Sequence, residues 1–281
     1  MPPNARFNPF IEMKFLSDYM TVLVAFAVVF ITACTAQDQN NLTRPLSYEM
    51  NSVEKVYEGA EEEAKNETYC KVSYPVFSDG EHAEAINHYL LGWIADSTAF
   101  SSVSGDSAGI TIEGLANNFF AEYDSFRKDF PVSWPYQFEL TGSVLLNKDA
   151  FLTVDLSYYA YTGGAHGNSH TEYFVFDSRT GTRLGLNDVF EQGFEERLNK
   201  LIDRRYRQMK GLSPTDRLDG EKGMLFENFI HFNDNFALTE EGVSFFFNNY
   251  EITAYAFGPT KIDLPYSDLS GILKPEFSMI E

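Results

Sequence analysis

The stretch of sequence that decides the fold is residues 135–178, PYQFELTGSVLLNKDAFLTVDLSYYAYTGGAHGNSHTEYFVFDS. Apolar and polar residues alternate in it, and alternation with period two predicts β-strands that bury one face. Lys148 and Asp149 interrupt the alternation and predict a hairpin turn. A further strand follows the glycine-rich segment. We therefore expect antiparallel strands here, forming part of a central sheet.

The rest of the chain contains both helical and strand patterns. Apolar residues recur at helical spacing in residues 80–100, 109–130 and 194–210, and Gly211 suits the left-handed end of the last helix. A fourth, shorter helix is expected over residues 221–232. The order strands, helices, strands, helices, strands predicts an α+β fold with antiparallel sheets. Further strands are expected in residues 47–57, 68–77 and 235–252, and residues 256–269 are expected to form one more strand and a short terminal helix.

The N-terminus has the pattern of an export signal. Residues 19–33, YMTVLVAFAVVFITA, carry no charge and are shorter than the about 20 apolar residues that span a bilayer. Residues 31–34, Ile-Thr-Ala-Cys, resemble the lipobox of bacterial lipoproteins, so we expect an acylated Cys34 and attachment to a membrane. Thr35 favours the outer membrane, facing the periplasm. The alternative is an uncleaved anchor helix with an incidental cysteine.

Composition limits the partners of the remaining body. The net charge of −20 argues against nucleic acid and anionic lipid, which both repel an acidic protein. The charge favours basic proteins or cationic ligands, or it serves solubility alone. Of the two cysteines, Cys70 has no disulfide partner if Cys34 is acylated, and we expect it to be a small buried residue.

Three segments resemble a known pair of domain families. They are residues 158–168, YYAYTGGAHGN, residues 176–190, FDSRTGTRLGLNDVF, and the long segment that begins at Phe236 with FALTEEGV and ends with PYSDL. Together they resemble the paired domains of unknown function DUF4163 and DUF3298. The resemblance implies two small α+β domains, each an antiparallel sheet packed with helices. The expected division is a signal peptide over residues 1–33, a tether over 34–46, and domains over 47–167 and 168–281.

The resemblance also implies a function outside the cytoplasm. One relative in these families is the extracellular part of an anti-sigma factor that binds lysozyme, and another places the first domain ahead of a peptidoglycan deacetylase module. The chain shows no recognisable pattern of that catalytic module. We therefore expect a body in the cell envelope that binds lysozyme, another wall-active protein or a cell-wall glycan, and that is not an enzyme. Lysozymes are basic, so the acidic charge suits such a partner.

The turn between residues 162 and 168 is the clearest candidate site. Its glycines permit positive φ angles and close approach of a ligand. The alternative is a tight structural crossing in which His166 binds a backbone carbonyl. Two other functions stay open, a polysaccharide hydrolase with His166 as general base and a purely structural lipoprotein. The candidate ligand-binding residues are Tyr159, Tyr161, Thr162, Gly163, Gly164, His166 and Asn168.

Other chemistry finds little support in the sequence. His166 and His170 are four residues apart, which suits two metal ligands on a helix, but the glycines argue against a helix here. No third ligand is evident, so no metal or other cofactor is expected. There is no Gly-x-Ser-x-Gly motif of a nucleophilic serine. Residues 245–247, Phe-Phe-Phe, with Tyr250 and Tyr255 predict a core strand; the alternative is that their solvent-facing half recognises a sugar or a protein.

Overall fold

A computed structural model describes residues 44–58, 67–100, 110–130 and 134–277. The described residues from Pro45 onward belong to one compact unit, Pro45–Glu281. The expected signal peptide and Cys34 lie outside the described residues. Within the described ranges, no helix combines the length and the hydrophobicity needed to cross a bilayer.

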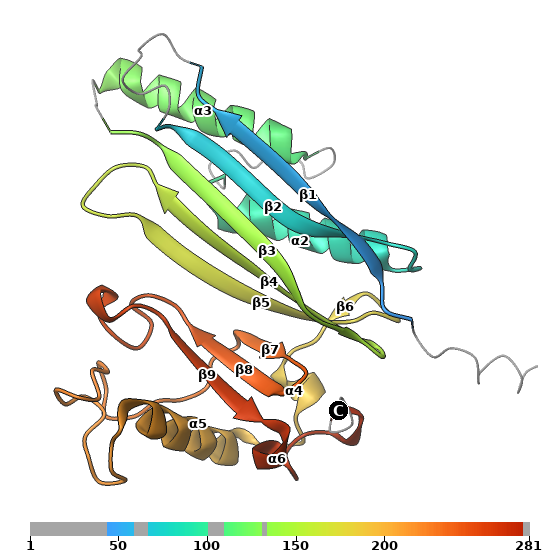
Figure 1. The fold of residues 1–281 in the computed structure, drawn as a ribbon, viewed down its shortest axis with the longest axis vertical. Helices are drawn as coiled ribbons and strands as arrows, with labels where there is room; N and C mark the ends of the chain where they lie inside the picture. The colour runs from blue at the N-terminus through green and yellow to red at the C-terminus, as the bar shows by residue number, and fades with distance from the viewer. Residues whose placement is uncertain (1–43, 59–66, 101–109, 131–133, 278–281) are drawn as a thin grey trace, which may run out of the picture. The chain divides into compact units, whose positions relative to one another are not determined.

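A six-stranded sheet forms the first layer of the fold (Figure 1). The strands lie side by side in the order of the sequence. All neighbouring pairs are antiparallel except β2 and β3, which are parallel. The sequence predicted antiparallel pairing alone; the parallel pair arises because two helices separate these strands along the chain. The strands are β1 (Ser47–Val56), β2 (Tyr69–Ser78), β3 (Gln137–Lys148), β4 (Phe151–Tyr161), β5 (Asn168–Asp177) and β6 (Thr182–Arg183).

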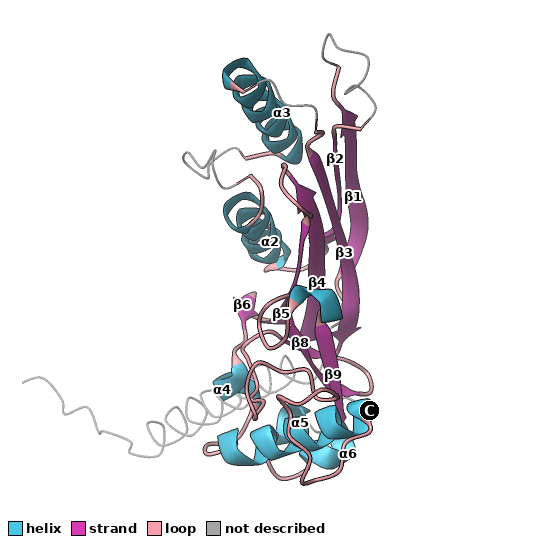
Figure 2. Cartoon of the chain, turned by 90° about the vertical axis from the view of Figure 1, so that its left-hand side faces the viewer, coloured by secondary structure: helices cyan, strands magenta, loops and turns pink. Residues whose placement is uncertain are grey.

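Two helices cover one face of this sheet, α2 (Ala83–Ser97) and α3 (Ile112–Asp129). Figure 2 shows both on the same side of the strands. Their apolar faces and one face of the sheet form a hydrophobic core that includes Cys70, which is fully buried as expected. The helix α3 begins after Thr111, whose side chain accepts a hydrogen bond from the Gly114 N–H at 3.1 Å. The opposite face of the sheet is free of these helices.

A smaller antiparallel sheet and its helices form the rest of the described chain. Its strands are β7 (Phe236–Leu238), β8 (Gly242–Phe247) and β9 (Thr260–Pro265). The helix α5 (Glu195–Lys210) packs beside β9. It ends at Gly211, which has the expected left-handed φ of 63°. The remaining short elements are α4 (Leu186–Val189), η2 (Tyr255–Phe257), α6 (Tyr266–Leu269) and η3 (Pro275–Phe277).

The helix predicted over residues 221–232 is wrong. The segment consists of turns and one isolated bridge, between Leu225 and Thr253. Met224 has a φ of 64°, which is incompatible with a right-handed helix. The Leu225 N–H binds the Leu218 carbonyl at 3.0 Å, so tertiary contacts satisfy the backbone. Leu225 and Ile230 are buried from this irregular backbone, whereas Phe226 and Phe229 are exposed.

The six-stranded sheet extends past the domain boundary expected near Gly167. That glycine lies in the turn between β4 and β5, and β5 pairs with β4 from Asn168 to Asp177. The sheet ends only with Arg183, in β6. The sheet continues across Gly167 because β4 and β5, which a tight turn joins, share backbone hydrogen bonds.

Two asparagine side chains join the smaller sheet to the outer edge of β5. The Asn235 Oδ1 accepts the Tyr173 N–H at 2.8 Å, and its Nδ2 donates to the Thr171 carbonyl at 2.8 Å. The Asn248 Oδ1 accepts the Thr171 N–H at 2.8 Å, and its Nδ2 donates to the same carbonyl at 3.0 Å. Because β6 is only two residues long, these amides satisfy backbone groups of β5 that no strand pairs with.

Candidate functional site

The sheet face opposite α2 and α3 carries a row of hydroxyl groups. Residues paired across neighbouring strands lie on the same face, and one such row crosses five strands. The Ser52 and Ser73 hydroxyls are 2.8 Å apart, and so are those of Ser157 and Thr171. This hydroxyl row consists of Ser52, Ser73, Thr141, Ser157 and Thr171.

Three tyrosines lie beside the hydroxyl row on the same face. Tyr159 pairs with Glu139, and Tyr161 pairs with Gln137, which pairs in turn with Tyr69. Tyr159 is 37% exposed, whereas the other two are half-buried, so each ring offers part of its surface to solvent. Tyr69, Tyr159 and Tyr161 are named here the tyrosine surface.

Charged groups surround the tyrosine surface. The Lys71 Nζ lies 5.1 Å from the centroid of the Tyr69 ring and forms an ion pair with Glu54 at 3.0 Å. Burial raises the pKa of the Tyr69 hydroxyl, and the charge of Glu139 raises it further. The phenol therefore stays protonated and can donate a hydrogen bond at neutral pH. Uncharged phenols beside hydroxyls suit a neutral polar ligand such as a sugar.

Positive φ angles and covering aromatic rings explain the glycines of the 162–168 turn. Gly163 and Gly164 have φ angles of 109° and 96°, which favour glycine. A Cβ atom at Gly163 would overlap the indole of Trp134, and one at Gly167 would overlap the ring of Tyr159. The turn thus holds Tyr159 in place by allowing its ring to lie on the backbone.

His166 is exposed at the tip of this turn. Its ring stacks on Tyr255, with centroids 4.1 Å apart, and its Nδ1 lies 2.9 Å from the Gly167 carbonyl oxygen. The Tyr255 hydroxyl donates to the same oxygen at 3.0 Å. A carbonyl only accepts, so Nδ1 must carry the proton and Nε2 is the acceptor of the neutral ring. His166 therefore combines the structural contact considered from the sequence with an accessible basic nitrogen.

The structure does not bring all the predicted residues together. Thr162 is exposed, and among the described residues no hydrogen bond joins it to His166. Asn168 pairs with Ala160, so it faces the helix side of the sheet, whereas Tyr159 and Tyr161 lie on the opposite face. Of the predicted set, the two tyrosines lie at the end of β4 and His166 lies in the turn that follows.

His170 takes part in a different network on the helix side. It pairs with Tyr158, and its Nε2 lies 3.4 Å from a Glu172 carboxylate oxygen. Arg183 holds the same carboxylate at 2.9 Å and donates to the Tyr89 hydroxyl at 2.7 Å. Burial would raise the pKa of Glu172, but hydrogen bonds from His170 and Arg183 lower it. No sequence spacing predicted this network, because its members come from β5, β6 and α2.

The other candidate reactive groups of the described residues are unreactive or already hydrogen-bonded. No group of three or more His, Cys, Asp or Glu side chains in the described ranges is arranged to hold a metal ion. Burial raises the pKa of the Cys70 thiol to about 12, so the thiolate is scarce at neutral pH. On the open sheet face, Ser143 donates to Asp155 from its hydroxyl and from its N–H. Burial raises the pKa of Asp155 despite these bonds.

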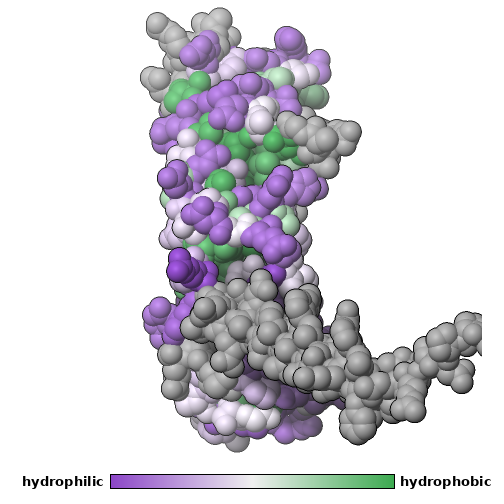
Figure 3. Space-filling model, turned by 90° about the vertical axis from the view of Figure 1, so that its right-hand side faces the viewer, coloured by the Kyte–Doolittle hydropathy of each residue, from purple (hydrophilic) through white to green (hydrophobic). Residues whose placement is uncertain are grey.

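A hollow at the β1 edge contains none of the predicted site residues. It has a volume of about 790 Å³ and lies between β1, β2 and α2. Figure 3, which views the molecule from this side, shows hydrophobic residues between hydrophilic ones. Its polar groups include Glu81, Glu84 and His88, while Val76 and Leu91 are the apolar ones.

Two family models match successive parts of the chain. Residues 61–169 match a model described as deacetylase PdaC, and residues 187–267 match DUF3298, a protein family of unknown function. The chain is also 27% identical over 122 residues to the peptidoglycan-N-acetylmuramic acid deacetylase PdaC of Bacillus subtilis strain 168. That match covers 42% of this chain and only 25% of the Bacillus protein.

The deacetylase matches contradict the expectation that the body is not an enzyme. Both the family model and the curated relative carry the name of a deacetylase. These similarities are distant, but they point toward an enzyme. The expectation rested on the absence of a recognisable catalytic pattern. Such a pattern requires residues close in sequence, whereas catalytic groups are often assembled only by folding.

Solved structures with the same fold belong to the DUF3298 family. One, from Bacteroides fragilis NCTC 9343, matches with a TM-score of 0.64 and 20% identity, over 84% of this chain and 97% of the other. Another, from Pseudomonas aeruginosa PAO1, matches with a TM-score of 0.61 and 21% identity, over 84% and 98%. The predicted α+β class is confirmed, and residues 187–267 form a DUF3298 domain.

Proposed function

We propose that this chain acts on peptidoglycan by holding the N-acetylated glycan strand on the tyrosine surface and hydrolysing its acetamido groups beside His166. The strongest support is that the candidate site and the deacetylase match lie in the same segment of the chain. Tyr69, Tyr159, Tyr161 and His166 all lie within residues 61–169, the segment that matches the deacetylase model. The three tyrosines lie on the open sheet face, and His166 lies in the turn that follows Tyr161.

The tyrosine surface suits a glycan chain. Sugar rings present flat C–H faces that pack on exposed phenol rings, and their hydroxyls require both donors and acceptors. The hydroxyl row runs beside the tyrosines and can supply both, because each serine or threonine hydroxyl donates once and accepts twice. A glycan strand is also long and narrow, which matches a row of groups that crosses several strands.

His166 can serve as the general base. Its Nδ1 is held by the Gly167 carbonyl, so Nε2 is available to take a proton from water. The water oxygen then bonds to the acetamido carbonyl carbon. The C–N bond breaks as the proton passes from Nε2 to the departing nitrogen, and the products are acetate and a free amine on the sugar. The stacked ring of Tyr255 fixes the orientation of the imidazole.

Binding is tested with the purified chain and insoluble peptidoglycan in a co-sedimentation assay. Tyr159→Ala should weaken binding about tenfold, because it removes the most exposed ring of the surface. The matched control is Phe226→Ala, which removes a 53% exposed ring outside this surface and should bind as the parent does. Equal binding by both variants would contradict the assigned surface.

Hydrolysis is tested by measuring acetate released from N-acetylated peptidoglycan. His166→Ala should lower the rate by about 100-fold or more, the contribution expected of a general base. The control is His231→Ala, which removes another exposed histidine. Acetate release by the parent that survives in His166→Ala would exclude His166 as the base, and no release by the parent would refute the proposed reaction.

Export through Cys34 is the second part of the proposal. An acylated Cys34 would place the folded body in the cell envelope, where peptidoglycan is, and multiple acyl chains hold a protein on a membrane stably. Metabolic labelling with palmitate should mark the parent chain and leave Cys34→Ser unmarked. Binding of lysozyme stays a prediction of the family resemblance, and residual lytic activity in a mixture of the two proteins would measure it.

A further inference from the structure

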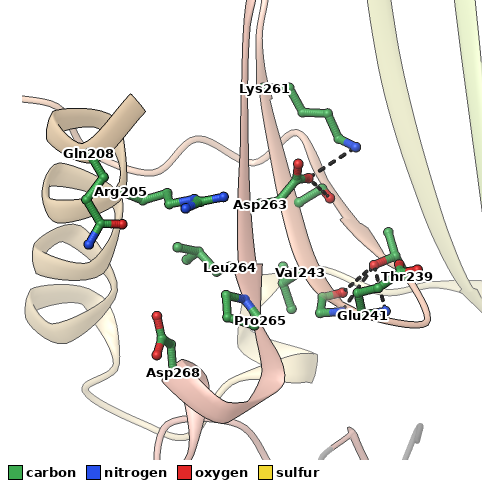
Figure 4. A pocket seen from close by; sticks show the side chains of 12 residues that line it. Arg205, Gln208, Thr239, Glu241, Val243, Lys261, Asp263, Leu264, Pro265 and Asp268 are labelled. Atoms are coloured by element: carbon green, nitrogen blue, oxygen red, sulfur yellow. Dashed lines mark hydrogen bonds and ion pairs between the residues drawn. The ribbon is translucent and has the colours of Figure 1, made fainter. Parts of the chain in front are cut away.

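A second cavity lies in the smaller sheet, far along the chain from the tyrosine surface. It has a volume of about 420 Å³ and is formed by α5, β8, β9, α6 and the turn between β7 and β8. This volume is within the range of about 300–1,000 Å³ that is typical of small-ligand sites. Figure 4 shows its side chains converging from the helix on one side and the strands on the other.

The cavity contains an arginine that has no partner among the described residues. Arg205 extends from α5 toward Asp263 and Leu264 on β9, as Figure 4 shows. It forms no hydrogen bond or ion pair with any described residue, although carboxylates line the same cavity. A guanidinium in this position can bind a ligand carboxylate with two parallel hydrogen bonds.

The carboxylates of the cavity are not equivalent. Asp263 is already engaged, because it accepts a hydrogen bond from Ser244 and forms an ion pair with Lys261 at 3.1 Å. Asp268 and Glu241 form no side-chain hydrogen bond or ion pair with a described residue, and both line the cavity. These two free carboxylates can bind an ammonium group of a ligand.

The part of the cavity lining between Arg205 and Glu241 is apolar. Val243 and Leu264 are 1% exposed, and Pro265 follows Leu264 in the cavity lining. Figure 4 places the two apolar side chains between Arg205 and the β7–β8 turn that carries Glu241. The exposed Pro265 is therefore the apolar lining residue that the small apolar part of a ligand can contact while its charged ends reach opposite groups.

We propose that this cavity binds a small zwitterion, such as a short peptide, that carries both a free ammonium and a free carboxylate. An anion without an ammonium would meet Arg205 but also two unpaired carboxylates and a net charge of −20. A simple cation would gain Asp268 and Glu241 but face Arg205. A zwitterion can pair with all three side chains, Arg205, Asp268 and Glu241. This inference goes beyond the proposed action on glycan, because it concerns other residues and another ligand.

The test uses the full chain in detergent micelles and the dipeptide alanyl-alanine as the probe, in both the L,L and the D,D forms. Isothermal titration calorimetry should detect binding of at least one form. The same dipeptide with an acetylated amine, or with an amidated carboxylate, should bind at least about tenfold more weakly, because each lacks one charge-assisted contact.

Variants assign the binding to the cavity. Arg205→Gln and Asp268→Asn should each weaken binding by about tenfold or more. Both side chains are exposed, so neither change should unfold the chain, and circular dichroism checks this. The matched control is Arg204→Gln, which removes the neighbouring exposed arginine of α5 that does not line the cavity.

Three results would overturn the inference. They are no binding of either dipeptide at millimolar concentration, equal binding of the blocked dipeptides, and equal loss in Arg204→Gln and Arg205→Gln. Peptidoglycan co-sedimentation through the tyrosine surface should be unchanged in Arg205→Gln, so failure here is distinguishable from failure of the proposed glycan binding.

Discussion

Replacing Asn235 with leucine removes one of the two asparagine side chains that connect β5 to the smaller sheet. Asn235 is 8% exposed, and its amide forms three hydrogen bonds. It accepts the Tyr173 N–H at 2.8 Å and donates to the carbonyls of Thr171 at 2.8 Å and Phe246 at 3.1 Å. Leucine has nearly the same size and can make none of these bonds, so the change isolates their contribution.

The expected loss of stability depends on which backbone groups lose their last hydrogen-bond partner. The Thr171 carbonyl keeps Asn248 as a donor, and the Phe246 carbonyl keeps Asn233 at 2.8 Å. Only the Tyr173 N–H is left buried and unsatisfied, which costs about 1–3 kcal/mol. Two other bonds contribute about 1 kcal/mol each in net terms. We therefore expect the free energy of unfolding to fall by about 3–5 kcal/mol.

The assay is urea unfolding followed by circular dichroism and by the fluorescence of the two tryptophans. Linear extrapolation of both signals gives the free energy of unfolding, and agreement between them supports a single transition. The control is Asn249→Leu. The Asn249 Oδ1 is buried and accepts no hydrogen bond from the described residues, so Asn249→Leu removes no such bond and should not lower the free energy of unfolding.

One outcome would refute the reasoning on Asn235. If Asn235→Leu unfolds at the same urea concentration as Asn249→Leu, the hydrogen bonds to β5 do not stabilise the fold. A lower slope of the unfolding transition in Asn235→Leu, with the two signals no longer coincident, would instead show that the smaller sheet separates first.

Three further predictions concern single positions. The pKa of Glu172 is raised by burial but lowered overall by hydrogen bonds from His170 and Arg183. Its contribution to stability is therefore fully present above the ordinary value of 4.5 and is lost as the pH falls through the lowered folded value, so the parent should lose stability below 4.5 more steeply than Glu172→Gln. Gly163→Ala should lower the free energy of unfolding by about 1–3 kcal/mol, because Gly163 has a φ of 109° and lies against an indole ring; an unchanged urea midpoint would contradict this. Cys70, whose pKa burial raises to about 12, should react with iodoacetamide only in urea, and rapid alkylation of the native chain at about pH 8 would show that the thiol is accessible.

The elements with strong local patterns could be predicted from the sequence. The alternation in β3 and β4 marks their buried faces, and Gly211 marks the end of α5 because a left-handed residue is needed there. The segment 221–232 was mispredicted as a helix, because apolar spacing does not distinguish a helix from an irregular segment whose residues are buried by tertiary contacts. Met224, with its positive φ, shows that the local backbone follows those contacts.

The candidate site was only partly predictable. The glycine-rich turn drew attention to Tyr159, Tyr161 and His166, since that composition signals a special backbone conformation. Tyr69 was missed, because it joins the surface through the parallel pairing of β2 with β3. Arg205 was missed as well, because nothing in the helical pattern of α5 indicates that this exposed cation faces a cavity.

The sequence by itself determined the α+β class, the acidic charge and most strands and helices, because periodicity, turn residues and charge are properties of neighbouring residues. Only the tertiary structure decided which strands are neighbours, where the first sheet ends, and which face of it remains open. The physical reason is that sheet pairing and side-chain amide bonds such as those of Asn235 join residues far apart in the chain. Their partners are set by packing over the whole body, and local sequence does not encode them.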